Sequence, residues 1–225
     1  MPRIWLVPTA LALVAAASPN WTATVRTQPS GAHVMGNPAA RVKLVEYLSY
    51  TCGHCAHFAT EAKQALRQNY VAKGLVSVEF RNAVRDRYDF AAALLARCGG
   101  AGRFHGNTEA LFAAQEEWLS KAPAFERDNG ARVAALSIND GLKAIARGVG
   151  LDEIMVRRGF TQTQIDGCLT AKAEQEKVAA MANEAWNSRK IKGTPFFLIN
   201  GAPVEGVGNW SGLEPRLKSA AMAGK

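Results

Sequence analysis

Apolar and polar positions change their spacing along the chain, and these changes predict its elements. Residues 42–48 are apolar apart from Lys43 and Glu46, as in a strand buried on both faces. Residues 52–74 carry apolar side chains at spacings of three and four, which indicates a helix. Residues 75–80 then alternate as a second strand. This order predicts a βαβ unit with parallel strands and a right-handed crossover.

A helical period fills residues 87–191. It predicts helices at roughly 87–98, 103–119, 123–136, 138–148, 151–159 and 161–189. About a hundred residues without a strand pattern exceed what a crossover needs. We therefore expect a large helical subdomain that is inserted into the α/β unit.

A strand pattern returns near the C-terminus. Residues 196–199 and 202–205 are predicted strands, and Asn200-Gly201 between them favours a tight antiparallel hairpin. Pro203 places the second strand at an edge of the sheet. Residues 211–222 begin with the Ser-x-x-Glu spacing of a capping box and predict a final helix. The predicted fold class is α/β, with the order βαβ, helical insertion, ββα.

The first forty residues precede this pattern. Residues 1–17 combine an early arginine, an apolar run and three alanines, which is typical of a cleaved secretory signal peptide. Residues 18–40 are rich in small and turn-forming residues, and we expect a short leader there. Export would place the four cysteines in an oxidising compartment, where disulfides persist.

Composition adds two limits. A chain of 225 residues that is 48% hydrophobic can bury one core, or one domain with a large insertion. The net charge of +8 would suit a nucleic-acid partner, but the Lys and Arg residues are scattered and do not form runs with interleaved aromatics. We expect a solvated basic surface and no nucleic-acid partner.

Cys52 and Cys55 lie where the strand at 42–48 passes into a helix. The free N–H groups and the positive dipole end of that helix favour the thiolate of Cys52, and Cys55 is placed to close a disulfide with it. We predict a redox couple in which Cys52 is the exposed nucleophile. Zinc would need four ligands, and no second Cys-x-x-Cys or His-x₃-His motif is present, so we expect no metal site.

Two titratable residues are candidates for assisting this pair. His54, if it is protonated or hydrogen-bonded toward Cys52, would stabilise the thiolate and make the disulfide more oxidising. The alternative is an exposed histidine without effect. Glu46 is a lone acid in an apolar strand, where burial would neutralise it unless it reaches water. Its alternative is a position facing the sheet edge, paired with Lys43 or Lys192.

The combination of Glu46, Cys52-Gly-His-Cys55, a helical insertion and Gly193-Thr-Pro195 before a strand resembles the DsbA-type branch of the thioredoxin superfamily. The resemblance covers essentially the whole mature chain. It implies a thioredoxin fold with an inserted helical domain, and periplasmic thiol–disulfide exchange. The implied segments are 41–86, the insertion 87–191, and 192–225.

The resemblance also implies roles for individual residues. Glu46 would relay protons for Cys55. Thr194 and Pro195 would form a substrate-binding turn against Cys52, with a cis bond that leaves the Thr194 backbone free to pair with an extended chain. The alternative is an ordinary trans proline that starts a strand.

Cys98 and Cys168 lie on predicted apolar helix faces of the insertion. Some alphaproteobacterial members of the resembled family carry a second disulfide of this kind, worth about 4 kcal/mol on the loop-entropy description. The alternative is two buried free thiols. If the bridge exists, we expect it to be buried and unable to exchange with Cys52.

By the same resemblance the function is that of a dithiol oxidase that donates the Cys52–Cys55 disulfide to reduced exported proteins, without a cofactor. A DsbB-like quinone-linked membrane protein would restore the disulfide. Gly53 and Thr194 differ from the best-known oxidase, so a DsbG-like isomerase or reductase stays open. The stretch 18–41 is too short for the dimerisation domain of such isomerases, and we expect a monomer.

A different class of function also uses this scaffold. Non-catalytic metal- or copper-handling modules of the thioredoxin type usually add Met or His ligands near the cysteines. No Met lies within ten residues of Cys52, and this favours the enzyme.

Overall fold

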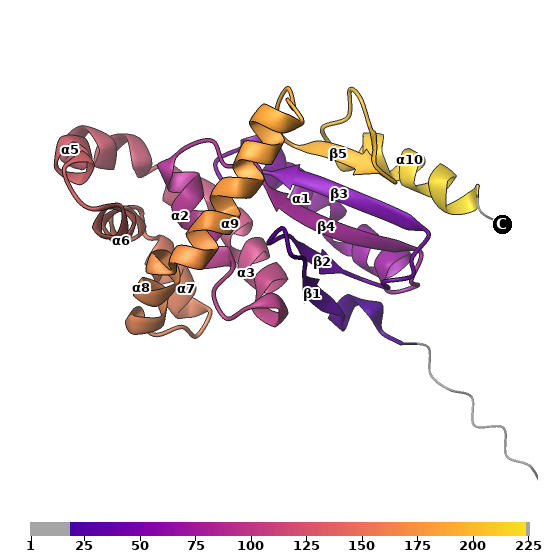
Figure 1. Cartoon of the computed structure of the whole chain (residues 1–225), viewed down its shortest axis with the longest axis horizontal. Coiled ribbons are helices and arrows are strands. Elements are labelled where there is room, and N and C mark those ends of the chain that lie inside the picture. The colour runs from indigo at the N-terminus through magenta and orange to yellow at the C-terminus, as the bar shows by residue number, and fades with distance from the viewer. Residues whose placement is uncertain (1–18, 224–225) are drawn as a thin grey trace, which may run out of the picture.

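The computed structural model describes residues 19–223, so the predicted signal peptide at 1–17 lies outside the described part. Six strands form one mixed sheet, and most of the helices form a block beyond the end of the sheet to which β3 points (Figure 1). The strands are β1 Val25–Thr27, β2 His33–Met35, β3 Val42–Leu48, β4 Val76–Asn82, β5 Phe196–Ile199 and β6 Ala202–Pro203. Their order in the sheet is β1-β2-β4-β3-β5-β6.

The pairing of the central strands agrees with the pattern. β3 and β4 are parallel, and β5 pairs with β3 in the antiparallel sense, so Glu46 of β3 lies between Phe80 and Phe197. Asn200 and Gly201 have φ of 51° and 84°, the left-handed backbone that a tight hairpin requires. β6, with Pro203, forms one edge of the sheet. The predicted α/β thioredoxin fold with a helical insertion is confirmed.

The leader contains structure that the sequence pattern did not predict. β1 and β2 extend the sheet, because β2 pairs with β4 and β1 pairs with β2, both in the antiparallel sense. Strands of three residues are too short to display an alternating period. Their side chains nevertheless join the fold, since all three residues of β2 are buried.

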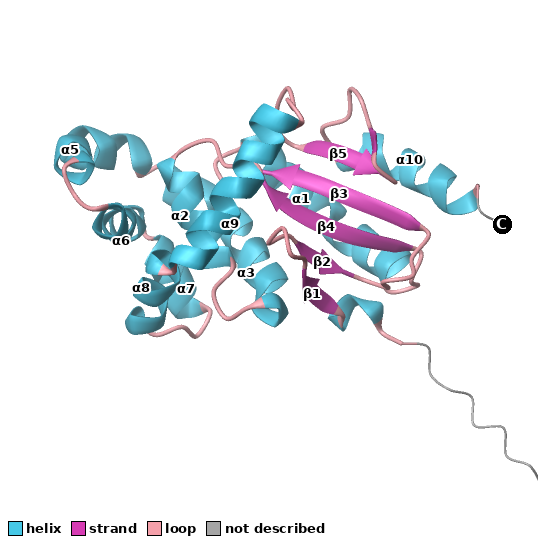
Figure 2. Ribbon diagram, in the orientation of Figure 1, coloured by secondary structure: helices cyan, strands magenta, loops and turns pink. Residues whose placement is uncertain are grey.

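Helices cover both faces of the sheet, as the ribbon in Figure 2 shows. The helices after the first strands are α1 Gly53–Ala65, α2 Arg87–Ala96, α3 Ala101–Ala113, α4 Gln115–Leu119, α5 Ala122–Ala134, α6 Ile138–Val149, α7 Leu151–Arg157, α8 Gln162–Thr170, α9 Lys172–Asn183 and α10 Trp210–Met222. A 3₁₀ turn η1 Trp21–Ala23 precedes β1, and π-helical turns η2 Leu66–Val71 and η3 Glu184–Ser188 extend α1 and α9. None of the helices described is long and apolar enough to cross a membrane.

Two predicted helices are each divided into two in the structure. The helix expected at 103–119 is divided at Ala114, and the one expected at 161–189 is divided at Ala171, where ψ is 96°. The break frees the Leu169 carbonyl, which accepts a hydrogen bond from Gln175 Nε2 at 2.7 Å. The Gln175 side chain supplies the hydrogen bond that the helix break removes, and this offsets the cost of the break. No Gly or Pro marks the position of the break in the sequence.

The last helix also begins differently. Asn209, and not Ser211, is the N-cap of α10, because its side chain accepts from Gly212 N at 3.0 Å. Glu214, which would complete the predicted capping box, instead accepts from Tyr70 Oη at 3.1 Å. The Glu214 carboxylate, which the sequence pattern assigned to the cap of α10, therefore contacts η2 instead.

The two faces of β3 belong to different cores. Leu44 and Leu48 pack with the main hydrophobic core, which includes Phe58 of α1. Val45 and Tyr47 pack in a smaller cluster with Ala185 of η3. α1 therefore covers one face of the central strand and the end of α9 covers the other, and this layering holds the β3–α1 junction in place.

Candidate active site

Cys52 lies at the N-cap of α1, directly after β3. Its carbonyl oxygen accepts from Cys55 N at 3.0 Å and Ala56 N at 3.2 Å, which begins the helix. Both cysteines are free thiols in this structure. The prediction that Cys52 is exposed is wrong, because only 4% of it is accessible. The Cys52 thiol donates to the Thr194 carbonyl oxygen at 3.2 Å, so the loop before β5 covers the sulfur.

Different surroundings separate the two thiols chemically. A hydrogen bond from the Cys55 thiol is the main cause that lowers the pKa of Cys52 to about 5, and burial opposes it. A hydrogen bond with the Thr194 side chain, the Cys55 backbone N–H and the charge of Arg85 add to the lowering. Burial raises the pKa of Cys55 far above its ordinary value. The reduced pair is therefore a Cys52 thiolate beside a Cys55 thiol.

Thr194 and Pro195 lie against Cys52, as the sequence predicted, and the bond between them is cis. They form one wall of a pocket of about 520 Å³, and the loop 204–209 forms the other. His54 also lines this pocket and is exposed. No hydrogen bond between His54 and Cys52 is present among residues 19–223, so the structure places His54 at the pocket and not against the sulfur.

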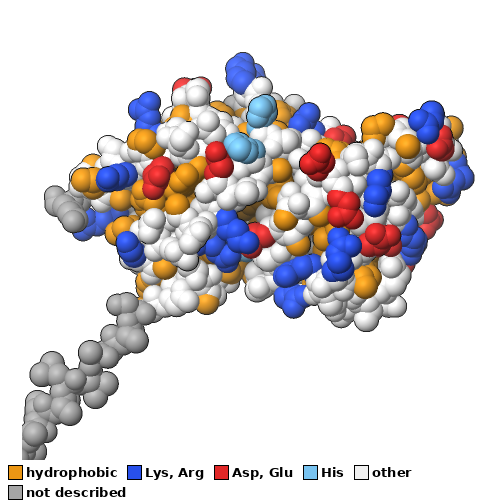
Figure 3. Space-filling model, turned by 180° about the vertical axis from the view of Figure 1, so that it is seen from behind, with side chains coloured by type: hydrophobic (Ala, Val, Ile, Leu, Met, Phe, Trp, Pro, Cys, Tyr) orange, Lys and Arg blue, Asp and Glu red, His pale blue; other side chains and the backbone are white. Residues whose placement is uncertain are grey.

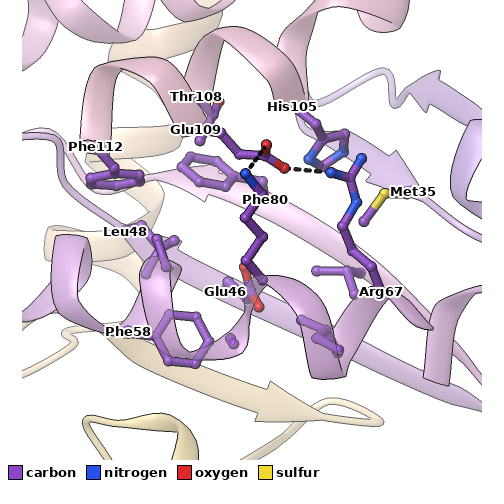
Figure 4. A pocket seen from close by; sticks show the side chains of 15 residues that line it. Met35, Glu46, Leu48, Phe58, Arg67, Phe80, His105, Thr108, Glu109 and Phe112 are labelled. Atoms are coloured by element: carbon purple, nitrogen blue, oxygen red, sulfur yellow. Dashed lines mark hydrogen bonds and ion pairs between the residues drawn. The ribbon is translucent and has the colours of Figure 1, made fainter. Parts of the chain in front are cut away.

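Glu46 points from the middle of β3 into a cavity of about 80 Å³, shown in Figure 4. The alternative of an edge-facing Glu46 paired with a lysine is wrong, because β3 is central and Lys43 Nζ instead donates to Pro38 O at 2.6 Å. Burial raises the pKa of Glu46 to about 8, and its Oε1 has no protein partner. A cavity of this volume has room for ordered water, which would satisfy that oxygen.

The rim of this cavity is charged. Glu109 of α3 pairs with Lys63 Nζ at 3.0 Å and with Arg67 Nη1 at 2.5 Å, and Figure 4 shows Arg67 reaching Glu109 across the opening. These ion pairs join the insertion to the helix that carries Cys55. No hydrogen bond between Glu46 and Cys55 is present among the described residues, so the proton relay stays a proposal.

Replacement Glu46→Gln is expected to change how stability depends on pH. The folded-state pKa of about 8 lies above the ordinary 4.5. Between pH 4.5 and pH 8, Glu46 is therefore protonated in the folded chain and ionised in the unfolded chain. The contribution of Glu46 to the free energy of unfolding is fully present below pH 4.5. It falls as pH rises toward 8, by up to about 1.4 kcal/mol per pH unit. Urea unfolding of the variant should lack this fall and show the larger gain over the parent at pH 8 than at pH 5. Parallel profiles for the two proteins would contradict the assignment.

Sequence reasoning missed a buried carboxylate that holds the Cys52 loop. Asp89, in the first turn of α2, is fully buried and accepts from Ser49 Oγ at 2.6 Å, Tyr50 N at 2.7 Å and Arg85 N at 3.0 Å. Burial raises the pKa of Asp89 to about 7. Its only sequence signal is an acidic residue near the start of an apolar helix, which is also typical of simple capping.

A second missed residue comes from α4. Gln115 Nε2 donates to the carbonyl oxygens of Tyr50 at 2.7 Å and Cys52 at 3.0 Å. Thr51 Oγ1 donates to Asp86 Oδ2 at 2.8 Å, just before α2. The loop that carries Cys52 is thus fixed by residues of the insertion and of the turn that precedes it, and no motif in the sequence indicates these contacts.

The predicted bridge between Cys98 and Cys168 is present, with 5.6 Å between the Cα atoms. Cys98 lies in the turn after α2 and is buried, whereas Cys168 of α8 is only partly buried. The expectation of a fully buried bridge therefore holds for one sulfur.

No group of three or more His, Cys, Asp or Glu side chains that could hold a metal ion occurs in the part of the chain that the structure describes.

Comparisons with known proteins agree with this geometry. A family model described as Thioredoxin matches residues 28–218, and the chain belongs to this family. The crystal structure of a protein-disulfide isomerase from Novosphingobium aromaticivorans is 33% identical, with a TM-score of 0.80 over 85% of this chain and 98% of that one. The structure of Wolbachia pipientis alpha-DsbA1 is 20% identical, with a TM-score of 0.66 over 84% and 89%. The resemblance in fold to DsbA-type proteins is confirmed.

Curated relatives are longer than this chain. A Rickettsia bellii protein named "Putative protein-disulfide oxidoreductase" is 25% identical over 173 residues, which cover 76% of this chain and 58% of the relative. A Rickettsia typhi protein of similar name is 26% identical, with 56% of the relative covered. The chain thus spans little more than half the length of these curated relatives.

Proposed function

We propose that the chain is a periplasmic thiol–disulfide oxidoreductase of the DsbA type, which donates the Cys52–Cys55 disulfide to reduced exported proteins. The observation that carries the proposal is the lowered pKa of Cys52, about 5, beside the raised pKa of Cys55. A stabilised thiolate favours the reduced enzyme over the disulfide, and it is also a good leaving group. Both effects drive disulfide transfer from the enzyme to its substrate.

The reaction has two exchange steps. A substrate thiolate attacks the Cys52 sulfur, the Cys52–Cys55 bond breaks, and Cys55 leaves and takes up a proton because its pKa is high. A second substrate thiolate then attacks the substrate sulfur in the mixed disulfide, and Cys52 leaves as a thiolate. The substrate gains a disulfide and the enzyme gains two electrons. Protonated Glu46, in the cavity beneath α1, is the proposed source of the proton for Cys55.

The pocket at Thr194 and Pro195 is the proposed site for the substrate chain beside its cysteine. It adjoins Cys52 through the Thr194 carbonyl, and its opposite wall is the loop 204–209. Figure 3 shows Lys and Arg side chains spread among acidic ones over one face of the molecule, so no single-signed patch on that face selects a polyanion. The proposed substrate is therefore a polypeptide.

Location and partners follow from the same chemistry. The Cys98–Cys168 disulfide is typical of an oxidising compartment, which supports export to the periplasm. Each turnover leaves a reduced enzyme, so an electron acceptor is required, and a DsbB-like quinone-linked membrane protein is the proposed partner. We propose that the enzyme acts as a monomer.

Isomerisation is the second candidate, because the Novosphingobium structure, with its TM-score of 0.80, is that of a protein-disulfide isomerase. An isomerase acts in its reduced form on wrongly paired disulfides. The same Cys52 thiolate would serve either role, so the redox state that performs the reaction separates them.

The test compares reduced and oxidised protein. Urea unfolding is expected to show that the reduced form is the more stable, because its thiolate pKa is lowered from 9.0 to about 5 on folding. This contribution is fully present above pH 9 and is lost as pH falls toward 5, so the difference between the two forms should grow with pH by up to about 1.4 kcal/mol per unit. Oxidised protein should also form disulfides stoichiometrically in a reduced unfolded substrate. A more stable oxidised form, with activity only on scrambled disulfides, would refute the oxidase in favour of the isomerase.

A further inference from the structure

Tyr50, which lies shortly before Cys52, is enclosed by the insertion. Its backbone N–H donates to Asp89 of α2 at 2.7 Å, and its carbonyl oxygen accepts from Gln115 Nε2 of α4 at 2.7 Å. Its hydroxyl shares a hydrogen bond of 2.8 Å with Thr108 of α3. The helical block lies beyond the end of the sheet to which β3 points, so the loop that leaves β3 runs into this block (Figure 1). Helices of the insertion therefore bind the polar groups of a residue that belongs to the thioredoxin fold.

Gln115 also reaches Cys52 itself. The same Nε2 atom donates to the Cys52 carbonyl oxygen at 3.0 Å. That oxygen accepts from Cys55 N at 3.0 Å and from Ala56 N at 3.2 Å as well, which are the first helical bonds of α1. Gln115 is buried, so bulk water does not compete for these bonds. One amide group of the insertion thus fixes the peptide group at which β3 passes into α1.

The helix α4 gives Gln115 a rigid support. The chain breaks between α3 and α4 at Ala114, and Gln115 is the first residue of the new helix. Trp118 of α4 is fully buried, and its Nε1 donates to the Leu111 carbonyl oxygen of α3 at 3.0 Å. A side chain on a packed helix is held more precisely than one on a loop. The break at Ala114 and the Trp118 contact therefore keep the Gln115 amide at the Cys52 loop.

The Cys52 thiolate depends on short contacts. The Cys52 sulfur lies 3.2 Å from the Thr194 carbonyl oxygen, and the thiol and backbone N–H of Cys55 bond to this sulfur. Hydrogen bonds weaken steeply with distance and misalignment, so a displacement of about 1 Å would weaken all of these contacts together. The position of the Cys52 backbone therefore governs the chemistry of its sulfur.

We propose that Gln115 is a positioning residue for Cys52, whose bonds to the Tyr50 and Cys52 carbonyls keep the sulfur in contact with Cys55 and Thr194. The proposal rests on the proposed oxidase function, because it concerns the thiolate that this function uses. A sulfur that is held in place stabilises the reduced form relative to the disulfide. Through Gln115, the insertion sets the equilibrium between the dithiol and the disulfide of the thioredoxin fold.

The test is the substitution Gln115→Met, because methionine has a similar size and cannot donate a hydrogen bond. Alkylation of the reduced variant by iodoacetamide should show a Cys52 midpoint about one pH unit above the parent value near 5, since a lost buried hydrogen bond can change an equilibrium about tenfold. A less stable thiolate makes the disulfide less oxidising. The equilibrium of the variant with a glutathione buffer at pH 7 should therefore shift about tenfold toward the disulfide form.

The matched control is Asn107→Leu in α3. Asn107 is also buried, and its Nδ2 likewise donates to backbone carbonyl oxygens, those of Ala96 at 3.2 Å and Cys98 at 2.9 Å. Its Oδ1 accepts from Arg158 Nε at 3.2 Å, so the control removes at least as many bonds. Neither carbonyl belongs to the Cys52 loop. Asn107→Leu should lower the free energy of unfolding as much as Gln115→Met does, and it should keep the Cys52 midpoint near pH 5.

An unchanged midpoint and glutathione equilibrium in Gln115→Met would overturn the proposal. An equal shift in Asn107→Leu would also overturn it, because the effect would then come from a general loosening of the insertion. If Gln115→Met does not fold, Gln115→Asn takes its place: it keeps the amide but is too short to reach both carbonyls, and its midpoint should also rise. A parent protein that oxidises no reduced substrate, while Gln115→Met still shifts the midpoint, would refute the oxidase function and retain the positioning role.

Discussion

Replacement Cys52→Ser is expected to abolish disulfide transfer completely. A serine hydroxyl cannot form the mixed disulfide, and the buried Cys55 cannot replace it, because burial raises the pKa of the Cys55 thiol and leaves it protonated. The measurement is oxidation of dithiothreitol and of a reduced unfolded protein by stoichiometric enzyme, which should fall to the rate of buffer alone. Retained oxidation would show that another sulfur carries the reaction.

The matched control is Cys55→Ser, which keeps the attacking sulfur and removes the resolving one. We expect this variant to accumulate a mixed disulfide when it is given a substrate that contains a disulfide, because the Cys52 thiolate attacks one substrate sulfur, the other leaves as a thiolate, and no Cys55 is present to resolve the product. The adduct should be visible as a thiol-sensitive mass increase. In the reduced parent, alkylation by iodoacetamide should rise with a midpoint near pH 5, as the pKa of Cys52 requires, and Cys52→Ser should lack this step. A midpoint near the ordinary thiol value would contradict the arrangement at Thr194 and Cys55.

Replacing both Cys98 and Cys168 with serine is expected to lower the free energy of unfolding by about 4 kcal/mol. The bridge closes a loop of 70 residues, and its removal returns that loop's entropy to the unfolded chain. Urea unfolding should compare the oxidised parent with the oxidised variant. The control repeats the comparison with both proteins fully reduced, where the difference should nearly disappear.

Activity provides a separate outcome for this pair of substitutions. Cys98 lies in the turn after α2, and no hydrogen bond among residues 19–223 joins it to the catalytic loop. The alkylation midpoint of Cys52 should therefore stay near pH 5 in the variant. An unchanged melting temperature would show that the bridge has no structural role, and a shifted Cys52 midpoint would show that the two sulfur pairs are coupled.

The parts of the fold that the sequence predicts are those with a long or chemically distinctive pattern. β3, α1 and β4 each extend over enough residues to display a period. The pair Asn200-Gly201 is typical of a tight hairpin turn, which the structure contains. β1 and β2 have three residues each, which is too few for a period. The break at Ala171 depends on a hydrogen bond from Gln175 that local spacing does not reveal.

The same distinction applies to the residues of the candidate site. Cys52, Cys55, Thr194 and Pro195 carry the resemblance in short motifs, and the structure brings them together. The contact with Thr194 was predicted but the low exposure of Cys52 was not, because exposure depends on how closely a loop 142 residues away packs over the sulfur. Asp89 and Gln115 were missed for the same reason: each is one polar residue in a helix, and its partners are known only when the helices are packed.

The contacts from Asp89 and Gln115 have a consequence for the order of events during synthesis. Both residues follow Cys52 in the chain, and they bond to the backbone of Tyr50 and Cys52 only when α2 and α4 have packed against the sheet. Thr194, which accepts from the Cys52 thiol, arrives later still. A growing chain that has emerged only through β4 therefore lacks the Asp89, Gln115 and Thr194 contacts around Cys52. The surroundings of the Cys52 sulfur are complete only when the segment that carries Thr194 has folded.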